Sequence, residues 1–205
     1  MRTPFNALLI ALCCATIFLT GCKASSPDTN LIGNNNCNPP CWNEITPGQT
    51  NKDQATMAMH QINYEKGGEL SVSDYGISWQ ERTFGRVYAI EFEGNLVKLI
   101  RFPTERTSLE QILSLFGEPD YLITEPGKGK GGGNFILIYY PNKGLAFTID
   151  LKSQKTVTAD GSVVGSWFLP PTDIRNAIGI IHGEEWIDEF MARIHNWNGY
   201  GEVTP

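Results

Sequence analysis

Basic residues are scarce in this chain of 205 residues, which has 16 lysines and arginines against 22 aspartates and glutamates and a formal net charge of −6. Nucleic-acid binding needs a clustered basic surface against the phosphate backbone, so this charge balance argues against a nucleic-acid partner. Glycine and proline number 21 and 12 and follow no period, while aromatic residues reach 11%. These values exclude a collagen-like, coiled-coil or wholly disordered chain and suit one domain of ordinary size.

Catalytic and cofactor motifs are also sparse. The sequence has no Gly-x-Ser-x-Gly elbow, and no two of His60, His182 and His195 stand four residues apart. Glu184 and Glu185 follow His182, but the preference for negative charge at a helix start explains them without a metal. We therefore expect no catalytic residue, no metal site and no cofactor.

One glycine-rich stretch resembles a phosphate-binding loop in its letters only. Residues 127–132 satisfy G-x-G-x-x-G, but they run into the strand-like Phe135–Tyr140 rather than opening a helix. A nucleotide loop needs a helix N-terminus facing the phosphate, so we interpret this stretch as a hairpin loop.

The N-terminus carries the clearest signal of where the protein resides. Arg2 precedes an apolar run from Phe5 to Leu19, and a small residue, Gly21, follows. The run is shorter than the roughly 20 residues that a transmembrane helix needs, and its order is typical of a secretory signal peptide. We predict a signal peptide over residues 1–21.

The end of this segment adds a lipid anchor. Leu19-Thr20-Gly21-Cys22 resembles the bacterial lipobox, which implies that Cys22 is acylated and that the preceding peptide is removed. The mature chain then has 184 residues and a net charge of −7, because Arg2 is the only charged residue lost. Acyl chains at Cys22 make the membrane a partner, and they place the protein at the cell membrane or outer membrane, facing the extracytoplasmic side. Residues 22–36 are polar and rich in turn formers, so we expect a flexible tether spanning on the order of 20 Å.

Two cysteines remain in the mature body, Cys37 and Cys41. In an exported chain, two thiols at this spacing indicate a small-loop disulfide. The alternatives are a metal or redox site. Three residues, two of them prolines, separate the cysteines, which does not match a C-x-x-C redox motif, and no further cysteine completes a metal site.

The remaining chain, residues 37–205, predicts an α+β domain with helices packed on an antiparallel sheet. Capping boxes at Thr50–Asp53 and Thr107–Glu110, 57 residues apart, each open a helix, and Gly117 ends the second. Alternating apolar residues and turn signals predict the following strands: 69–72, 76–80, 86–93, 96–102, 120–124, 135–140, 145–151 and 163–169. The recurring order suggests two tandem helix-plus-strands units, residues 45–102 and 104–151.

A C-terminal extension, residues 152–205, follows these units. We expect a helix from about Glu184 in it. The apolar face of this helix is formed by Ile187, Phe190, Met191, Ile194 and Trp197.

Short motifs in the first unit carry a family resemblance. Pro40-Cys41-Trp42 and Ile45-Thr46-Pro47-Gly48-Gln49-Thr50 look like the opening of a group of uncharacterised bacterial lipoproteins. More distantly, they resemble the SmpA/OmlA-type outer-membrane-assembly lipoproteins and the β-lactamase inhibitor protein, whose fold is two such units in tandem. The resemblance implies helices on an antiparallel sheet, but a fold alone assigns no function.

Aromatic residues supply the candidate binding site. We take Trp42, Trp79, Tyr139 and Tyr140 as candidate binding aromatics, since exposed aromatics dominate interface hot spots. The function expected from the sequence is a membrane-anchored, non-catalytic module that binds an envelope protein or an extracellular ligand. Two alternatives stay open. One is an extracytoplasmic hydrolase using Asp, Glu and His of the C-terminal part, and the other is a purely structural envelope protein.

Overall fold

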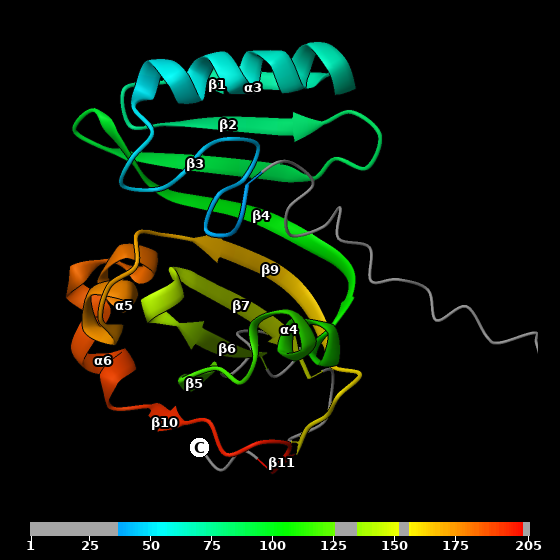
Figure 1. Ribbon diagram of the computed structural model, residues 1–205, viewed down its shortest axis with the longest axis vertical. Helices are drawn as coiled ribbons and strands as arrows, with labels where there is room; N and C mark the ends of the chain where they lie inside the picture. The colour runs from blue at the N-terminus through cyan, green and yellow to red at the C-terminus, as the bar shows by residue number, and fades with distance from the viewer. Residues whose placement is uncertain (1–36, 126–134, 152–155, 203–205) are drawn as a thin grey trace, which may run out of the picture.

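The computed structural model describes residues 37–125, 135–151 and 156–202 (Figure 1). The predicted signal peptide, Cys22, the predicted tether and the glycine-rich stretch 127–132 lie outside the described residues. Among the helices that are described, none is both long and apolar enough to cross a membrane.

A nine-stranded antiparallel sheet forms the centre of the protein, in the order β1-β2-β3-β4-β9-β7-β6-β5-β10 (Figure 1). Its strands are β1 Gly68–Val72, β2 Gly76–Glu81, β3 Val87–Glu93, β4 Leu96–Ser108, β5 Tyr121–Glu125, β6 Phe135–Tyr140, β7 Leu145–Asp150, β9 Ser162–Phe168 and β10 Ile194–Asn196. Two further strands, β8 Thr156–Val157 and β11 Gly201–Glu202, pair with each other apart from this sheet. With the helices packed on it, the sheet confirms the predicted α+β class.

The order of elements repeats along the chain. α3 (Lys52–Lys66) precedes β1 to β4, and α4 (Leu109–Phe116) precedes the four strands β5, β6, β7 and β9 of the same sheet. The two sets meet where β4 pairs with β9, and the buried hydroxyls of Thr104 and Ser166 hydrogen-bond to each other across this seam. The fourth strand of the second set, β9, comes from the stretch that was expected to be a C-terminal extension.

Both helices begin one residue later than predicted. Asn51 caps α3: its side chain accepts a hydrogen bond from the Gln54 N–H at 2.9 Å, and the Gln54 side chain accepts from the Asn51 N–H at 3.0 Å. The Thr50 hydroxyl instead accepts from the Thr46 N–H at 2.8 Å. Ser108 caps α4 in the same way with Gln111, because Thr107 is still part of β4.

The two faces of the sheet are packed differently. On the helical face, one core joins α3, α4 and the N-terminal strap, which we define as residues 37–50. The predicted stripe Ala55, Met59 and Ile62 of α3 is buried here. A second core lies on the opposite face, where it covers β9, β7, β6 and β5 and reaches Leu99 of β4, but it includes no residue of β1 to β3.

The C-terminal part differs from the predicted single helix. It forms α5 (Ile174–His182), the 3₁₀ turn η3 (Glu184–Trp186) and the short α6 (Ile187–Met191). Ile194 does not extend a helix but opens β10, which pairs with β5. The helix prediction from Glu184 through Trp197 is therefore wrong beyond Met191, because sheet pairing takes over the end of the apolar stripe.

Candidate functional site

The side of β1 to β4 that faces away from α3 carries a row of exposed side chains. Successive side chains of a strand point to opposite faces, so Ile77, Trp79 and Ile90 enter the helical core while their neighbours face outward. We call this outward surface the open face. It consists of Glu69, Ser71, Ser78, Gln80, Val87, Ala89, Glu91 and Arg101. Leu99 of β4 points to the same side but is buried in the second core.

One cross-strand row shows how the open face relates to the rest of the sheet. Ser71, Ser78, Ala89 and Arg101 lie opposite one another on β1, β2, β3 and β4. The same row continues through Trp167, Ala146, Tyr139 and Tyr121 on the other half. On β1 to β4 the side chains of this row are two serines, an alanine and an arginine. Where α5 and α6 cover the sheet, the side chains of the row are mostly aromatic.

A shallow hollow lies on the open face beside the β1–β2 turn. Its volume is about 250 Å³, and its floor is formed by small side chains. Its lining includes Ser71, Ser73, Tyr75, Gly76, Ser78, Ala89 and Glu91. Gly76 is needed there, because a Cβ at this position would lie 2.4 Å from the Ile90 carbonyl oxygen. The hollow is therefore built by strand pairing and is open to solvent.

A second hollow of about 240 Å³ lies at the other end of the same strands. Glu69, Gln80, Glu81 and Arg82 line it. One carboxylate oxygen of Glu81 is buried without a hydrogen-bond donor in the described part of the chain, and it lies 3.6 Å from a guanidinium nitrogen of Arg86. The hollow is thus polar and carries both signs of charge.

Arg101 and Glu91 give the open face two charges without internal partners. Both side chains are exposed, and neither takes part in an ion pair among the described residues. The cross-strand neighbours of Arg101 are Ala89 and Trp167, which offer no carboxylate. A guanidinium in this setting can donate a bidentate pair of hydrogen bonds to a partner's carboxylate.

The four candidate binding aromatics are placed in the core and not at the surface. Trp42, Trp79, Tyr139 and Tyr140 are 8%, 1%, 0% and 1% exposed. Two of them have internal hydrogen-bond partners: the Trp79 N–H donates to Asn63 at 3.0 Å, and the Tyr140 hydroxyl donates to the Gly117 carbonyl at 2.8 Å. Burial raises the pKa of the Tyr140 phenol. A role as surface anchors does not fit this burial, because large aromatic side chains are the main source of buried apolar area in a domain of this size.

Other aromatics are exposed instead. Tyr75 in the β1–β2 turn is 86% exposed, Phe84 in the β2–β3 turn is 66% exposed, and Tyr64 on α3 is 87% exposed. Tyr75 and Phe84 thus stand at opposite ends of the hairpin that carries the open face. The available sequence signal was their position in turn-rich stretches, Ser73-Asp74-Tyr75-Gly76 and Thr83-Phe84-Gly85.

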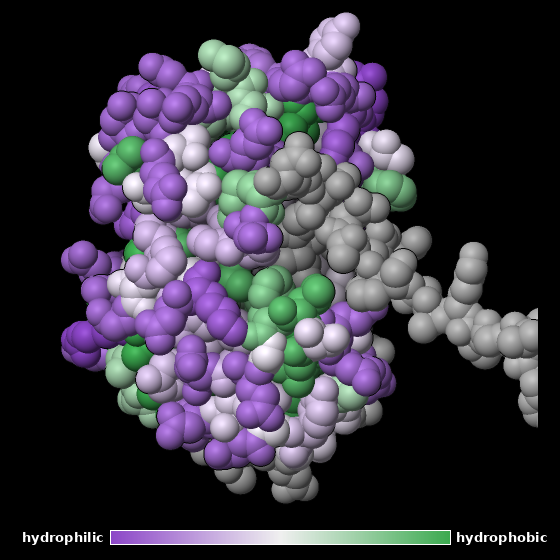
Figure 2. All heavy atoms as spheres, viewed as in Figure 1, coloured by the Kyte–Doolittle hydropathy of each residue, from purple (hydrophilic) through white to green (hydrophobic). Residues whose placement is uncertain are grey.

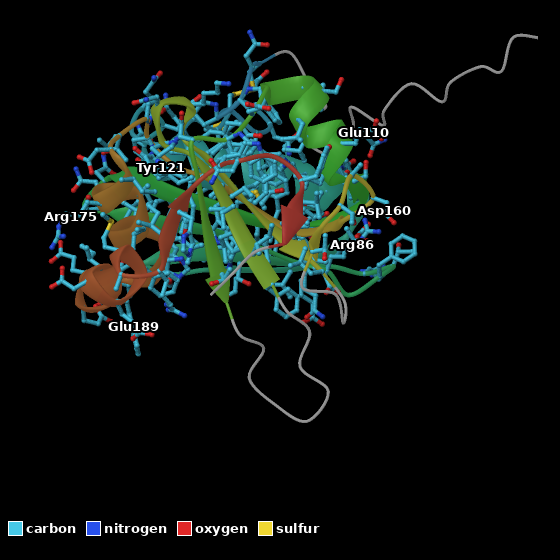
Figure 3. All side chains as sticks on the ribbon, turned by 90° about the horizontal axis from the view of Figure 1, so that it is seen from below. Arg86, Glu110, Tyr121, Asp160, Arg175 and Glu189 are labelled. Carbon is cyan, nitrogen blue, oxygen red and sulfur yellow. A yellow bond between two sulfur atoms is a disulfide. The ribbon has the colours of Figure 1, made fainter. Side chains whose placement is uncertain are left out.

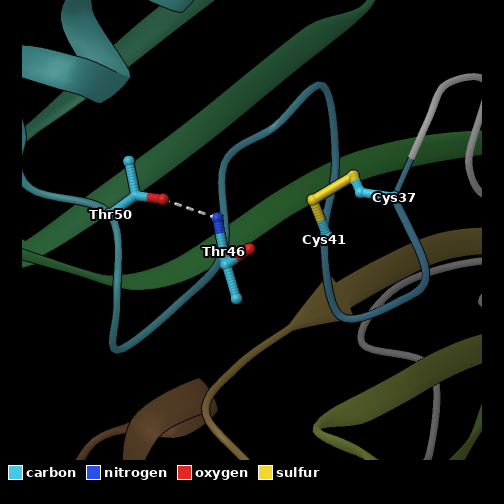
Figure 4. Close-up of a disulfide and its surroundings, with 4 residues drawn as sticks. All are labelled: Cys37, Cys41, Thr46 and Thr50. Atoms are coloured by element: carbon cyan, nitrogen blue, oxygen red, sulfur yellow. Dashed lines mark hydrogen bonds between the residues drawn. A yellow bond between two sulfur atoms is a disulfide. The ribbon is translucent and has the colours of Figure 1, made fainter.

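The N-terminal strap carries the remaining predicted residues that are described. Cys37 and Cys41 are joined by a disulfide with sulfur atoms 2.06 Å apart and Cα atoms 5.7 Å apart (Figure 4). Directly after Cys41, the ring of Trp42 stacks on Tyr88 and Phe102, with ring centroids 5.7 Å and 5.8 Å away. The strap is therefore bound to β3 and β4 through one buried indole.

The helical face offers a different surface. Figure 2 shows hydrophobic side chains gathered over α4, where Leu115 is exposed, while hydrophilic side chains dominate the α3 end above it. Neither of the two hollows described above lies on this face. Tyr64, on the outer side of α3, therefore serves as a reference position away from the open face.

Among the described residues, His182 is the histidine whose ring makes a hydrogen-bond contact with another side chain. His182 lies 2.9 Å from the Tyr139 hydroxyl through its Nε2 atom, and burial together with the nearby Arg193 charge lowers the pKa of His182 to about 4. Its polar neighbour is a phenol and not a carboxylate. Residues 37–125, 135–151 and 156–202 also contain no group of three or more His, Cys, Asp and Glu side chains placed to hold a metal ion. This geometry gives no support to the hydrolase alternative.

No protein-family model, curated protein or solved structure matches this chain. Function is therefore argued from the geometry of the open face.

Proposed function

We propose that this protein is a non-catalytic binding module that is anchored to a membrane through Cys22 and presents the open face to a protein partner on the extracytoplasmic side. The observation that carries the proposal is the contrast between the two halves of one sheet face. The half with β9, β7, β6 and β5 is apolar and covered by α5 and α6, which also bury Leu99 of β4. The outward side chains of β1 to β3 are mostly polar, and none of them belongs to this buried core.

The chemistry of the open face suits a partner that associates and dissociates. Non-obligate interfaces combine polar groups and trapped water with a few aromatic anchors. Tyr75 provides an exposed aromatic ring at the edge of the 250 Å³ hollow. Arg101 and Glu91 provide two charges that a partner's ion-pairing side chains would complement.

Tyr75→Ala and Ala89→Arg are the variants that test this proposal. Truncating an aromatic anchor removes about 2 kcal/mol of binding, or roughly a 30-fold loss of affinity. Ala89→Arg fills the floor of the hollow with a long charged side chain and is expected to abolish binding. The measurement is affinity for the partner captured by the soluble body, residues 23–205, from its own envelope extract and then purified.

Tyr64→Ala provides the matched control. Tyr64 is as exposed as Tyr75 but lies on α3, on the opposite side of the sheet. We expect wild-type affinity from this variant and unchanged thermal unfolding from Tyr64→Ala and Tyr75→Ala. Equal losses from Tyr64→Ala and Tyr75→Ala, or full binding by Ala89→Arg, would place the interface elsewhere and refute the proposal.

The anchor is tested separately through Cys22→Ser. Acyl chains at Cys22 hold the protein on the membrane at about 0.8 kcal/mol for each buried CH₂ group. We therefore expect this variant to lose acyl labelling and to move from the membrane fraction to the soluble fraction. Unchanged labelling and membrane association would remove the anchor from the proposal while leaving the open face untouched.

A further inference from the structure

His182 joins the C-terminal helices to the sheet. It is the last residue of α5, and its ring stacks on Phe190 of α6 with centroids 3.9 Å apart and planes 19° from parallel. Its Nε2 atom lies 2.9 Å from the hydroxyl of Tyr139 on β6, a residue with no exposed surface. One imidazole thus contacts both helices and the middle of the sheet.

The segment Ile174–Met191, which we call the cover, hides an apolar part of the sheet. Its buried hydrophobic side chains are those of Ala177, Ile178 and Phe190. Beneath them lie Leu99, Ile123, Leu137, Tyr139, Ala146 and Leu169. Figure 3 shows the cover on one side of the strands, with the labelled Arg175 and Glu189 at its outer edge, away from the sheet.

Charged groups surround His182 unevenly. Arg193, which follows α6, contacts the ring of Phe190 at 4.7 Å and pairs with Glu189 at 3.0 Å. Glu184 and Glu185 on η3 are exposed, and the Arg175–Asp188 pair lies at the surface. From β6, the neighbouring titratable group is the Tyr139 phenol. Among the residues that the structure describes, no carboxylate hydrogen-bonds to the imidazole or pairs with it, so a positive charge on the partly buried His182 would lie near Arg193 without a counter-ion of its own.

We propose that the cover opens in acid, with the His182–Tyr139 contact as its latch. Opening exposes the apolar half of the sheet face and makes it continuous with the open face of β1 to β4. The inference concerns the second half of the sheet, and it holds whether or not the open face binds a partner.

The direction of the pH effect follows from where the proton binds. With the cover closed, burial and Arg193 hold the pKa of His182 near 4, whereas an opened, hydrated imidazole titrates near its ordinary value of 6.5. Above pH 6.5 both states are neutral, so pH has no effect on opening. Between pH 6.5 and pH 4 the open state binds a proton that the closed state does not, and opening becomes up to about 10-fold more favourable for each pH unit. Below pH 4 both states are protonated and the effect levels off.

Hydrogen exchange of the cover amides, read by mass spectrometry and corrected for the intrinsic pH dependence of exchange, measures this equilibrium. For the wild-type protein we expect the opening constant of α5 to rise between pH 7 and pH 4, by at most about 300-fold. Peptides from β2 and β3 should keep their protection over the same range, which distinguishes local opening from unfolding of the whole domain.

His182→Gln removes the titrating group and is expected to give an opening constant that does not change between pH 7 and pH 4. If the glutamine variant does not fold, His182→Phe keeps a ring against Phe190 and carries the same expectation. His60→Gln, at an exposed position of α3, is the matched control and should keep the full wild-type rise. A rise that persists without His182, a flat wild-type response, or an equal loss of protection in β2 and β3 would overturn the proposal.

Discussion

Replacing Trp42 with alanine is expected to lower the free energy of unfolding by about 3–5 kcal/mol. The indole is stacked between the rings of Tyr88 and Phe102, and Ile45 of the same strap is fully buried in the same core. Alanine would leave a cavity that neighbouring β-strands cannot close, since their positions are held by sheet pairing. The measurement is a guanidinium titration of the wild type and the variant, compared at equal slope.

Trp186→Ala is the control for this substitution. Trp186 lies on η3, outside the strap, and its side chain is exposed. A change within about 0.5 kcal/mol is expected there, as for most surface substitutions. If the two tryptophan variants lost similar amounts of stability, the strap would not be part of the folded core.

Gly144→Ala is expected to lower the free energy of unfolding by more than about 3 kcal/mol. Gly144 ends the 3₁₀ turn after β6 with φ near +67°, a conformation that costs an L-residue about 1–2 kcal/mol. A Cβ there would also lie 2.2 Å from the Leu169 carbonyl oxygen and 3.2 Å from the ring of Pro40. The first contact is with backbone, so relief requires moving the end of β9 away from the turn.

Gly94→Ala separates the two contributions. Gly94 has φ near +60° in the β3–β4 turn, but nothing lies within 4 Å of a Cβ built there. Only the conformational cost of about 1–2 kcal/mol is expected. A loss for Gly144→Ala no larger than that for Gly94→Ala, measured by the same denaturant titration, would contradict the close contact with Leu169.

Local patterns predicted the strands well because hairpins are short-range structures. The apolar run Phe135–Tyr140 and the turn that follows it placed β6 at its observed bounds, and Gly94-Asn95 placed the β3–β4 turn. The helix starts were displaced by one residue for a reason outside the capping pattern. Thr50 and Thr107 both match the pattern, but the Thr50 hydroxyl accepts a local hydrogen bond from the Thr46 N–H in the preceding turn, and Thr107 is still paired in β4.

The C-terminal part was harder to predict because its structure depends on partners distant in the chain. Ile194 continues a helical apolar stripe in sequence, yet it pairs with Ile123 of β5. α5 was missed although Asp173 caps it after the Pro170-Pro171 break, with its carboxylate accepting from the Asn176 N–H at 2.9 Å. That capping signal was present in the sequence.

The candidate site could not be predicted from the residue types alone. Trp42 and Tyr75 are both aromatic residues near turn formers, but one is buried by rings from β3 and β4 while the other projects from a turn. The open face exists because the cover occupies only one half of the sheet. Which half remains uncovered depends on strand order, and no local pattern encodes that order.

The seam between β4 and β9 has a consequence for how the protein is made. Ile100 pairs with Phe168. The β4–β9 edge therefore cannot pair until residues that are synthesised after the whole of β5, β6 and β7 are available. Until β9 inserts, β4 and β7 each present an unpaired edge, and such edges invite pairing with other chains. Closing contacts this distant in sequence is also slow. A chain that is cut or delayed before residue 162 would therefore be the aggregation-prone species, although its first four strands already have their helix. Only the late strand β9 converts two exposed edges into a single continuous sheet.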